Sequence, residues 1–315
     1  MNEDKKYDSS LIGFIYGIAA YILWGFLPLY WKLLNKIPAT EILAHRILWS
    51  FVFLWTILYF SGNLQKYKEV FKDRLNIVRI SCATIFITIN WGTYIWAVNS
   101  NHIVEASMGY YINPLIVIVL GVVVLKEKLN TWQRVSLIMA TIGVCIITIS
   151  YGQIPWISLI LALSFGLYGL MKKMIPVAST VGLALETALL MPFTLIYIIF
   201  RQVSGVGALG NVSTVTTFIL IGTGIATALP LLWFAKGTRR IPLSSMGFLQ
   251  YIAPTISLAL GVFVFKEHFT KTHIVSFGFI WGGLIIYSIS QVNQMRKKRY
   301  EPLGKSIEAG ADIKR

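Results

Sequence analysis

Charged residues are scarce in this chain. Of its 315 residues, 13% are Asp, Glu, Lys or Arg and 56% are hydrophobic, and the mean hydropathy is +0.68. A soluble globular domain carries roughly 25% charged residues. The composition therefore excludes a soluble globule and predicts an integral membrane protein in contact with the lipid bilayer.

Acidic residues and cysteines are also few. Asp and Glu number 13 against 28 Lys and Arg, which gives a formal net charge of +15. Nucleic-acid-binding proteins gather basic residues on a folded surface, whereas here Lys and Arg lie between apolar runs, so we expect no nucleic-acid partner. Cys82 and Cys145 stand inside apolar runs without CxxC or His spacing. The sequence thus supports neither a disulfide nor a metal site.

Nucleotide-binding and catalytic motifs are missing. The chain has no GxxxxGK(S/T), HExxH or GxSxG segment, so neither an ATP-driven pump in one chain nor a metallohydrolase or serine hydrolase is supported. We therefore expect no cofactor and no enzymatic activity. Because ATP-driven transport is not supported, we expect that any transport would be coupled to a proton gradient or another ion gradient.

Ten apolar runs are long enough to cross a membrane as helices, which takes about 20 residues. They are Leu11–Trp31, Glu41–Phe60, Ile77–Val98, Ile103–Leu125, Trp132–Ser150, Ile154–Met171, Val181–Phe200, Thr214–Ala235, Ile241–Phe265 and Thr272–Val292. Lys and Arg are concentrated in alternate connections and in the C-terminal tail. Because cytoplasmic segments hold the excess of basic residues, we expect a multi-pass protein with both termini in the cytoplasm.

One stretch of the chain occurs twice. SMGYYINPLIVIVLGVVVLKEKL, from Ser107 to Leu129, returns as SMGFLQYIAPTISLALGVFVFKEHF, from Ser245 to Phe269. Several matched residues are 140 positions apart, namely Pro114 and Pro254, Gly121 and Gly261, Lys126 and Lys266, Glu127 and Glu267, Ser136 and Ser276, and Gly143 and Gly283. Before the prolines the offset is 138. Fixed Pro, Gly and Lys-Glu positions indicate an internal duplication.

Five spans per half is an odd number, so the two halves must enter the membrane from opposite sides. We therefore predict an all-α polytopic fold of ten transmembrane helices built as a 5+5 inverted repeat, the arrangement that alternating access requires. The expected segments are a cytoplasmic N-terminal segment (1–10), a first repeat (11–150), a second repeat (151–292) and a cytoplasmic basic tail (293–315). We expect residues 296–315 of the tail to be disordered, because this part is charged and has almost no apolar residues.

An ionisable side chain inside a membrane span costs free energy, so each one calls for a functional or structural explanation. His45 and Arg46 lie in the second span and Glu186 in the seventh, and Arg46 and Glu186 are also 140 positions apart. One hypothesis is that Arg46 and Glu186 pair, directly or through water, in or beside a substrate pathway. The alternative is a buried pair that only fixes helix packing. His45, on one helical face with Trp49, could carry a coupling proton or serve as a hydrogen-bonding strut.

Amide and aromatic side chains form the other candidate lining of the pathway. Proline frees a backbone carbonyl one turn back, so polar residues before Pro114 and Pro254 could contact a polar ligand. The candidates are Trp49, Asn90, Trp91, Tyr110, Tyr111, Asn113, Gln250 and Tyr251. Glycines of the fifth and tenth spans predict close helix contact, used inside the molecule or in the seam of a homodimer.

Seven stretches together resemble the RarD proteins of the EamA-domain family, within the drug/metabolite transporter superfamily. They are WGFLPLYWK (24–32), EILAHRILWS (41–50), NWGTYIWAVN (90–99), EASMGYYINPL (105–115), PWISLILALSFGLYGLMKK (155–173), GLALETALLMPF (182–193) and GFLQYIAPT (247–255). The resemblance implies a ten-helix inverted-repeat carrier in the bacterial cytoplasmic membrane, with a central cavity lined by helices one to four and six to nine. It implies no substrate.

These observations predict a secondary active transporter, an exporter or permease, of a small organic metabolite or drug-like compound, working by alternating access. The alternative is a flippase for a lipid or lipid-linked carrier, which would need an opening toward the bilayer. A membrane sensor or enzyme would need an output domain, a nucleophile or a metal set, for which the sequence gives no support.

Overall fold

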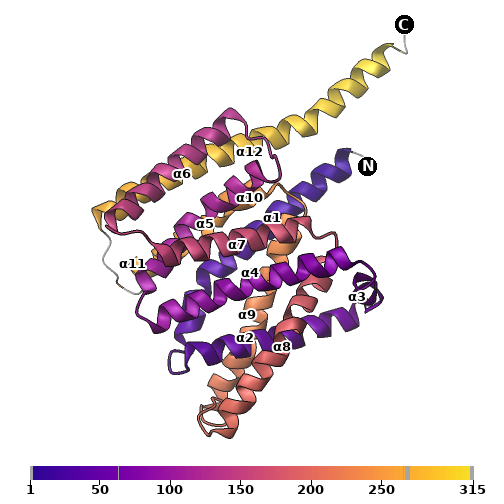
Figure 1. Cartoon of the computed structure of the whole chain (residues 1–315). Helices are drawn as coiled ribbons and strands as arrows, with labels where there is room; N and C mark the ends of the chain where they lie inside the picture. Colours follow the sequence, from indigo (N-terminus) through magenta and orange to yellow (C-terminus); the bar gives the residue numbers. More distant parts are fainter. Residues whose placement is uncertain (1–2, 63, 265, 267–269, 313–315) are drawn as a thin grey trace.

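The chain folds into a bundle of long helices (Figure 1). The computed structural model describes residues 3–62, 64–264, 266 and 270–312, with side chains described from 8 to 295 within those ranges. Its helices are α1 (Glu3–Lys32), α2 (Ala39–Phe60), α3 (Leu64–Val70), α4 (Arg74–Asn99), α5 (Ile103–Val123), α6 (Thr131–Ser150), α7 (Trp156–Met174), α8 (Ser179–Val203), α9 (Thr214–Thr238), α10 (Leu243–Gln250), α11 (Ile252–Phe263) and α12 (Lys271–Asp312).

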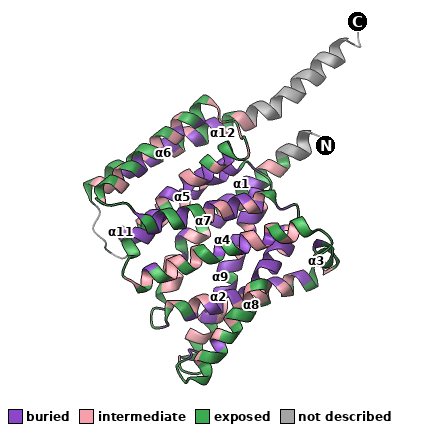
Figure 2. Cartoon of the chain, in the orientation of Figure 1, coloured by how far each residue is buried: buried purple, intermediate pink, exposed green. Residues whose placement is uncertain are grey.

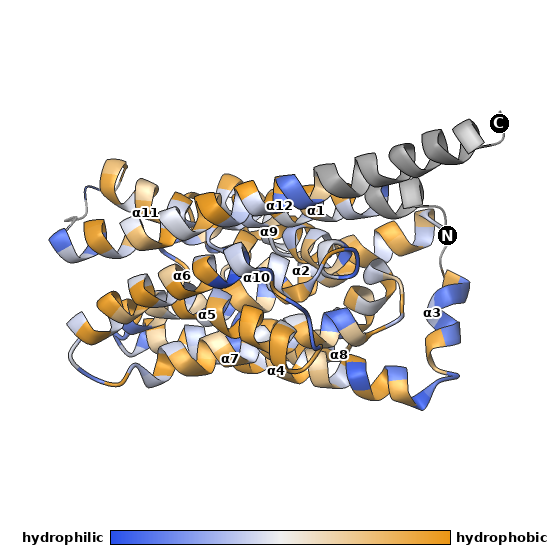
Figure 3. Ribbon diagram, turned by 90° about the horizontal axis from the view of Figure 1, so that it is seen from above, coloured by the Kyte–Doolittle hydropathy of each residue, from blue (hydrophilic) through white to orange (hydrophobic). Residues whose placement is uncertain are grey.

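Ten stretches of the described chain are long and apolar enough to cross a membrane. Nine are single helices, and α10 and α11 together make the other, Leu243–Phe263. The outward faces carry exposed apolar side chains such as Phe60, Phe193 and Val203, while buried residues gather in the middle of the bundle (Figure 2). Figure 3 shows hydrophilic residues on α3 and at helix ends. The predicted all-α fold with ten membrane-crossing helices is confirmed.

The packing of helices fits the predicted inverted repeat. Equivalent helices contact each other in three cases: α2 packs on α8, α5 on α10 and α6 on α12. The contact of α1 with α9 is matched by that of α7 with α4. Lys126 and Lys266 both have left-handed backbone, with φ of 55° and 60°, which non-glycine residues rarely adopt. The repeated Lys thus has the same backbone geometry in both halves. Glu267 lies outside the described residues.

The contact between α6 and α12 is reciprocal and depends on glycine. A Cβ at Gly143 would lie 2.6 Å from the carbonyl oxygen of Ser276, and a Cβ at Gly283 would lie 2.8 Å from that of Ser136. The sequence predicted these close contacts, and Gly143 and Gly283 make them inside the molecule. Each helix therefore approaches the other at the same repeated pair of positions.

Gly283→Leu is expected to lower the free energy of unfolding by about 1–3 kcal/mol, because the added side chain must push α6 and α12 apart. Gly278→Leu is the matched control on the same helix, since a Cβ at Gly278 would have no neighbour within 4 Å. Thermal unfolding of both variants in detergent checks this. Equal stabilities would contradict the close contact.

The two copies of the proline motif differ in structure. α5 runs through Pro114 as one helix, whereas the ninth span breaks at Tyr251 into α10 and α11, three residues before Pro254. Both prolines lack the backbone donor that would stabilise the preceding turn. The second copy also carries two extra residues between Gly247 and Pro254, and the break falls within that stretch.

The C-terminal tail differs from its prediction. Residues 296–315 were expected to be disordered, but the backbone of α12 continues as a helix from the tenth span to Asp312, and residues 313–315 lie outside the described part of the chain. Extending an existing helix needs no new nucleation, which is the costly step in helix formation. A high content of charged residues therefore does not by itself predict disorder in a segment that continues an existing helix. α1 begins, and α12 ends, on the same side of the bundle (Figure 1).

Candidate substrate pathway

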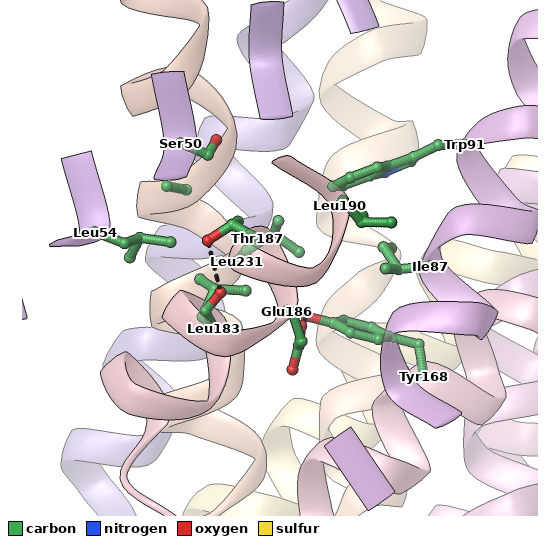
Figure 4. A pocket seen from close by; sticks show the side chains of 11 residues that line it. Ser50, Leu54, Ile87, Trp91, Tyr168, Leu183, Glu186, Thr187, Leu190 and Leu231 are labelled. Atoms are coloured by element: carbon green, nitrogen blue, oxygen red, sulfur yellow. Dashed lines mark hydrogen bonds between the residues drawn. The ribbon is translucent and has the colours of Figure 1, made fainter. Parts of the chain in front are cut away.

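A small pocket lies among α2, α4, α7, α8 and α9 (Figure 4). It is lined by Ser50, Leu54, Ile87, Trp91, Tyr168, Leu183, Glu186, Thr187, Leu190, Ala228 and Leu231. Its volume is about 10 Å³, which is close to the minimum for one water molecule. The lining comes from helices of both halves, and the space is nearly closed in this conformation.

Glu186 is the charged residue of the pocket. Lys172 Nζ lies 2.6 Å from Glu186 Oε1, and both side chains are almost completely buried. The Tyr168 hydroxyl donates a hydrogen bond to Glu186 Oε2 over 3.2 Å, and Figure 4 shows the two groups pointing toward each other. A buried carboxylate is tolerated when it is paired and hydrogen-bonded. Glu186 therefore has its counter-ion within the second half of the chain.

The predicted direct pair of Arg46 with Glu186 is wrong. Each lies seven residues after the start of its helix, α2 or α8, and the second and seventh of ten crossings must run in opposite directions. At 1.5 Å per residue, the two groups lie about 10 Å in from opposite ends of the bundle. The two residues occupy equivalent positions within their own halves, but the halves are inverted, so the side chains lie at different depths along the bundle.

Arg46 is held by aromatic rings and one hydroxyl. Its guanidinium carbon lies 4.7 Å from the ring centroid of Trp31 and 5.5 Å from that of Trp91. Arg46 Nε donates a hydrogen bond to Thr227 Oγ1 over 3.0 Å. Stacking over indole faces stabilises a guanidinium. The side chain of Arg46 is partly exposed, so the group is fixed in place without being sealed off.

Two tyrosines complete the surroundings of this cation. Tyr94 and Tyr110 lie within electrostatic range of Arg46, and their ring centroids are 6.5 Å apart. Tyr110 is 52% exposed. We call Trp31, Arg46, Trp91, Tyr94 and Tyr110 the Arg46 cluster. Trp91 belongs to this cluster and also lines the pocket, so the two features adjoin.

An aromatic cluster adjoins the pocket at Tyr168. The Tyr168 ring stacks on that of Phe234 at 6.1 Å, and Phe165 and Trp24 pack against Phe234 at 5.4 and 5.7 Å. These rings come from α1, α7 and α9. Large buried rings of this kind fill the interior, so any ligand that passes beyond Tyr168 requires them to move.

His45 is a buried residue of α2. Trp49 Nε1 donates to His45 Nδ1 over 3.3 Å, the contact that their four-residue spacing predicted. His45 is completely buried, and its Nε2 has no hydrogen-bond partner among the described residues. The backbone of Trp49 leaves no room for a side chain at Gly224. His45 is therefore enclosed at a close contact of α2 and α9 rather than on the pocket surface.

The predicted amide residues hold helices together. Asn90 Nδ2 donates to the Leu161 carbonyl over 2.9 Å, and Asn113 Nδ2 donates to the Ala162 carbonyl over 2.8 Å. Gln250 donates to the Asn113 side chain, so the two proline-motif clusters do meet. Their contact joins α5 to α10 and α7. It does not line the pocket.

The two remaining aromatic candidates also pack between helices. Tyr111 meets Phe277 edge to face at 5.3 Å, and Tyr251 is buried beside Ile112 and Ile280. Of the predicted pathway residues, Trp91 and Glu186 line the pocket, while Arg46 and Tyr110 join the Arg46 cluster. The pathway role of all these residues remains a prediction.

Comparison with known proteins identifies the family. A model of the EamA-like transporter family matches residues 11–149. The uncharacterized transporter YojE of Bacillus subtilis is 47% identical over 290 residues, covering 91% of this chain and 97% of YojE. Protein RarD of Escherichia coli is 37% identical over 285 residues, covering 90% and 96%. The chain is a RarD-like member of the EamA-like transporter family.

The RarD-like fold is also seen in a solved structure. A crystal structure described only as that of a protein superposes with a TM-score of 0.67 at 18% identity, covering 90% of this chain and 98% of that one. At this identity the match supports the fold alone. The relatives named as transporters support a membrane transporter rather than an enzyme.

Sequence reasoning missed several site residues of this RarD-like chain. Lys172 was placed in a connection, because the sixth span was ended at Met171. Its position four residues after Tyr168 puts both on one helical face, which was the available signal. Thr227 and Ser50 gave no signal, since hydroxyl residues are common in membrane helices and often bond to their own backbone.

Proposed function

We propose that this RarD-like protein is a secondary active transporter, an exporter or permease, that moves a small organic metabolite or drug-like compound across the bacterial cytoplasmic membrane by alternating access. The main support for this proposal is the pocket around Glu186, which is lined by residues of both halves of the chain. A pocket of about 10 Å³ holds no organic molecule, so transport requires the halves to move apart. The Lys and Arg distribution supports both termini in the cytoplasm.

Alternating access has a test that needs no substrate. In a chain with Cys82 and Cys145 replaced by alanine, Thr187→Cys in the pocket is expected to react with a charged, membrane-impermeant thiol reagent from both sides of the membrane. Right-side-out and inverted vesicles give the two directions. Leu220→Cys, at a completely buried position outside the pocket, is the unreactive control. Reaction from one side only would contradict alternating access.

Ion coupling is part of this proposal. Uptake into proteoliposomes under an imposed pH gradient, and separately under a Na⁺ gradient, distinguishes proton from cation coupling. Histidine is the side chain whose reference pKa lies nearest to neutral pH, so His45→Gln is expected to abolish the response to the pH gradient if His45 carries the proton. An unchanged response would assign His45 to packing with Trp49.

The flippase alternative is supported by one surface feature. A groove beside the end of α5 has apolar walls next to two cations, as an anionic lipid would require. It is lined by Val119, Val122, Val123, Glu127, Lys128, Leu129, Arg134 and Leu137. None of these residues lines the central pocket. A lipid bound in the groove would therefore follow a route separate from the pocket around Glu186. Scrambling of a fluorescent phosphatidylglycerol in proteoliposomes would favour this alternative.

A further inference from the structure

Repeat-equivalent positions 46 and 186 carry opposite charges, but among the described residues only position 186 has a counter-ion. Glu186 pairs with Lys172. Among the described residues the two ion pairs are Lys172–Glu186 and Arg201–Glu41, so Arg46 pairs with no carboxylate there. An unpaired cation in a membrane span is costly and marks a functional site by default. A ligand of opposite charge would complete the site.

The contacts of Arg46 leave one edge of its guanidinium open. The guanidinium carbon lies over the rings of Trp31 and Trp91, and Thr227 Oγ1 accepts a hydrogen bond from Nε. For Nη1 and Nη2 the described residues provide no hydrogen-bond partner, and Arg46 is partly exposed. Stacking and the Thr227 contact therefore fix the group while its terminal fork stays available. That fork matches the two oxygens of a carboxylate.

The rings around Arg46 indicate what accompanies the anionic group. Trp31, Trp91 and Tyr94 are partly exposed and Tyr110 is 52% exposed, so apolar ring surface remains uncovered beside the cation. Aromatic and aliphatic bodies bury area against such rings. Arg46 supplies a single positive charge, which a monoanion neutralises, whereas a dianionic phosphate would leave excess charge at low dielectric.

We propose that Arg46 binds the carboxylate of a small organic monoanion, whose apolar or aromatic body lies against the rings of the Arg46 cluster. This inference rests on the proposed transport function and names its substrate class. Trp91 connects the cluster to the pocket, where the Lys172–Glu186 pair is neutral as a whole. Passage of the anion between Arg46 and Glu186 then requires the pocket to open.

The test uses matched acids and amides. Binding of benzoate, phenylacetate, indole-3-acetate and hexanoate to the purified full chain is measured by calorimetry, each beside its neutral amide. At least one acid is expected to bind about tenfold or more tightly than its amide, because charge-assisted hydrogen bonds are the stronger ones. If no acid binds more tightly than its amide, the proposal is overturned.

Variants at position 46 test whether the tighter binding of acids than of amides depends on Arg46. Arg46→Gln is expected to weaken acid binding about tenfold or more and leave amide binding unchanged, and Arg46→Lys to recover only part, because lysine lacks the planar fork. Arg74→Gln, which removes an exposed charge, is the control. Thermal unfolding verifies that each variant is folded. An acid preference that survives in Arg46→Gln overturns the assignment, as does a phosphate ester bound more tightly than every acid.

Uptake of the tightest-binding acid into proteoliposomes separates the two proposals. Arg46-dependent binding without uptake under any gradient would reject the transport function and leave the anion site. Uptake of neutral compounds that is equal in wild type and Arg46→Gln would reject the anion site and leave the transport function.

Discussion

Lys172→Met is expected to lower the free energy of unfolding by about 3–4 kcal/mol at pH 7, because it leaves the buried carboxylate of Glu186 without its counter-ion. Protonating an isolated carboxylate at pH 7 costs about 4 kcal/mol, which sets the upper limit. Glu186→Gln leaves a buried ammonium instead, whose neutralisation costs about 5 kcal/mol. Thermal unfolding in detergent measures both losses.

The pH dependence of the two losses should have opposite signs. In Lys172→Met the folded state takes up a proton that the unfolded chain lacks at pH 7, so the loss shrinks by about 1.4 kcal/mol per unit as the pH falls toward 5. In Glu186→Gln the folded state releases a proton, so the loss shrinks as the pH rises toward 9. Lys66→Met, at an exposed site on α3, should show neither trend.

The double variant completes this test. Lys172→Met with Glu186→Gln is expected to lose clearly less than the sum of the two single variants, because no uncompensated charge remains. Additive losses with no pH dependence would contradict the ion pair. Uptake by the double variant, with protein level controlled, then decides whether the pair serves transport or only packing.

The number and placement of the spans could be predicted because lipid imposes one strong rule, that backbone groups are satisfied within a helix. The close approach at Gly143 and Gly283 was also predictable, since repeated small residues have few other uses. The partner of Glu186 was not. Lys172 and Lys173 were interpreted as connection residues, and only the inward direction of the Lys172 side chain brings it to Glu186.

Side-chain direction limited the rest of the prediction. Asn113 and Gln250 were chosen because they precede prolines, and they do meet, but in a contact between helices. Hydropathy cannot distinguish an amide that faces a pocket from one that bonds to a neighbouring carbonyl. Arg46 was identified because a charged residue in a span is costly, whereas its position over the rings of Trp31 and Trp91 depends on helix rotation that the sequence does not specify.

Glu127→Ala is expected to lower the free energy of unfolding by about 3 kcal/mol, because one carboxylate caps the start of α10. Glu127 Oε1 accepts the Leu243 amide at 2.7 Å, and Oε2 accepts the Ser244 amide at 2.8 Å and its hydroxyl at 2.6 Å. Glu127→Gln keeps part of these contacts and should lose about 1 kcal/mol. Lys128→Ala, at the exposed neighbouring position, is the control in thermal unfolding.

The same contact joins the two halves at one end of the helices, since Glu127 follows α5 and its partners Leu243 and Ser244 are the first two residues of α10. Gly121 has no room for a side chain between these groups, so the geometry is tightly packed. Weakening the contact should favour conformations open at that end. Thr187→Cys in the Glu127→Gln background is therefore expected to react faster from the side of Glu127 and no faster from the other. Equal acceleration from both sides would mean that Glu127 stabilises the fold without controlling access.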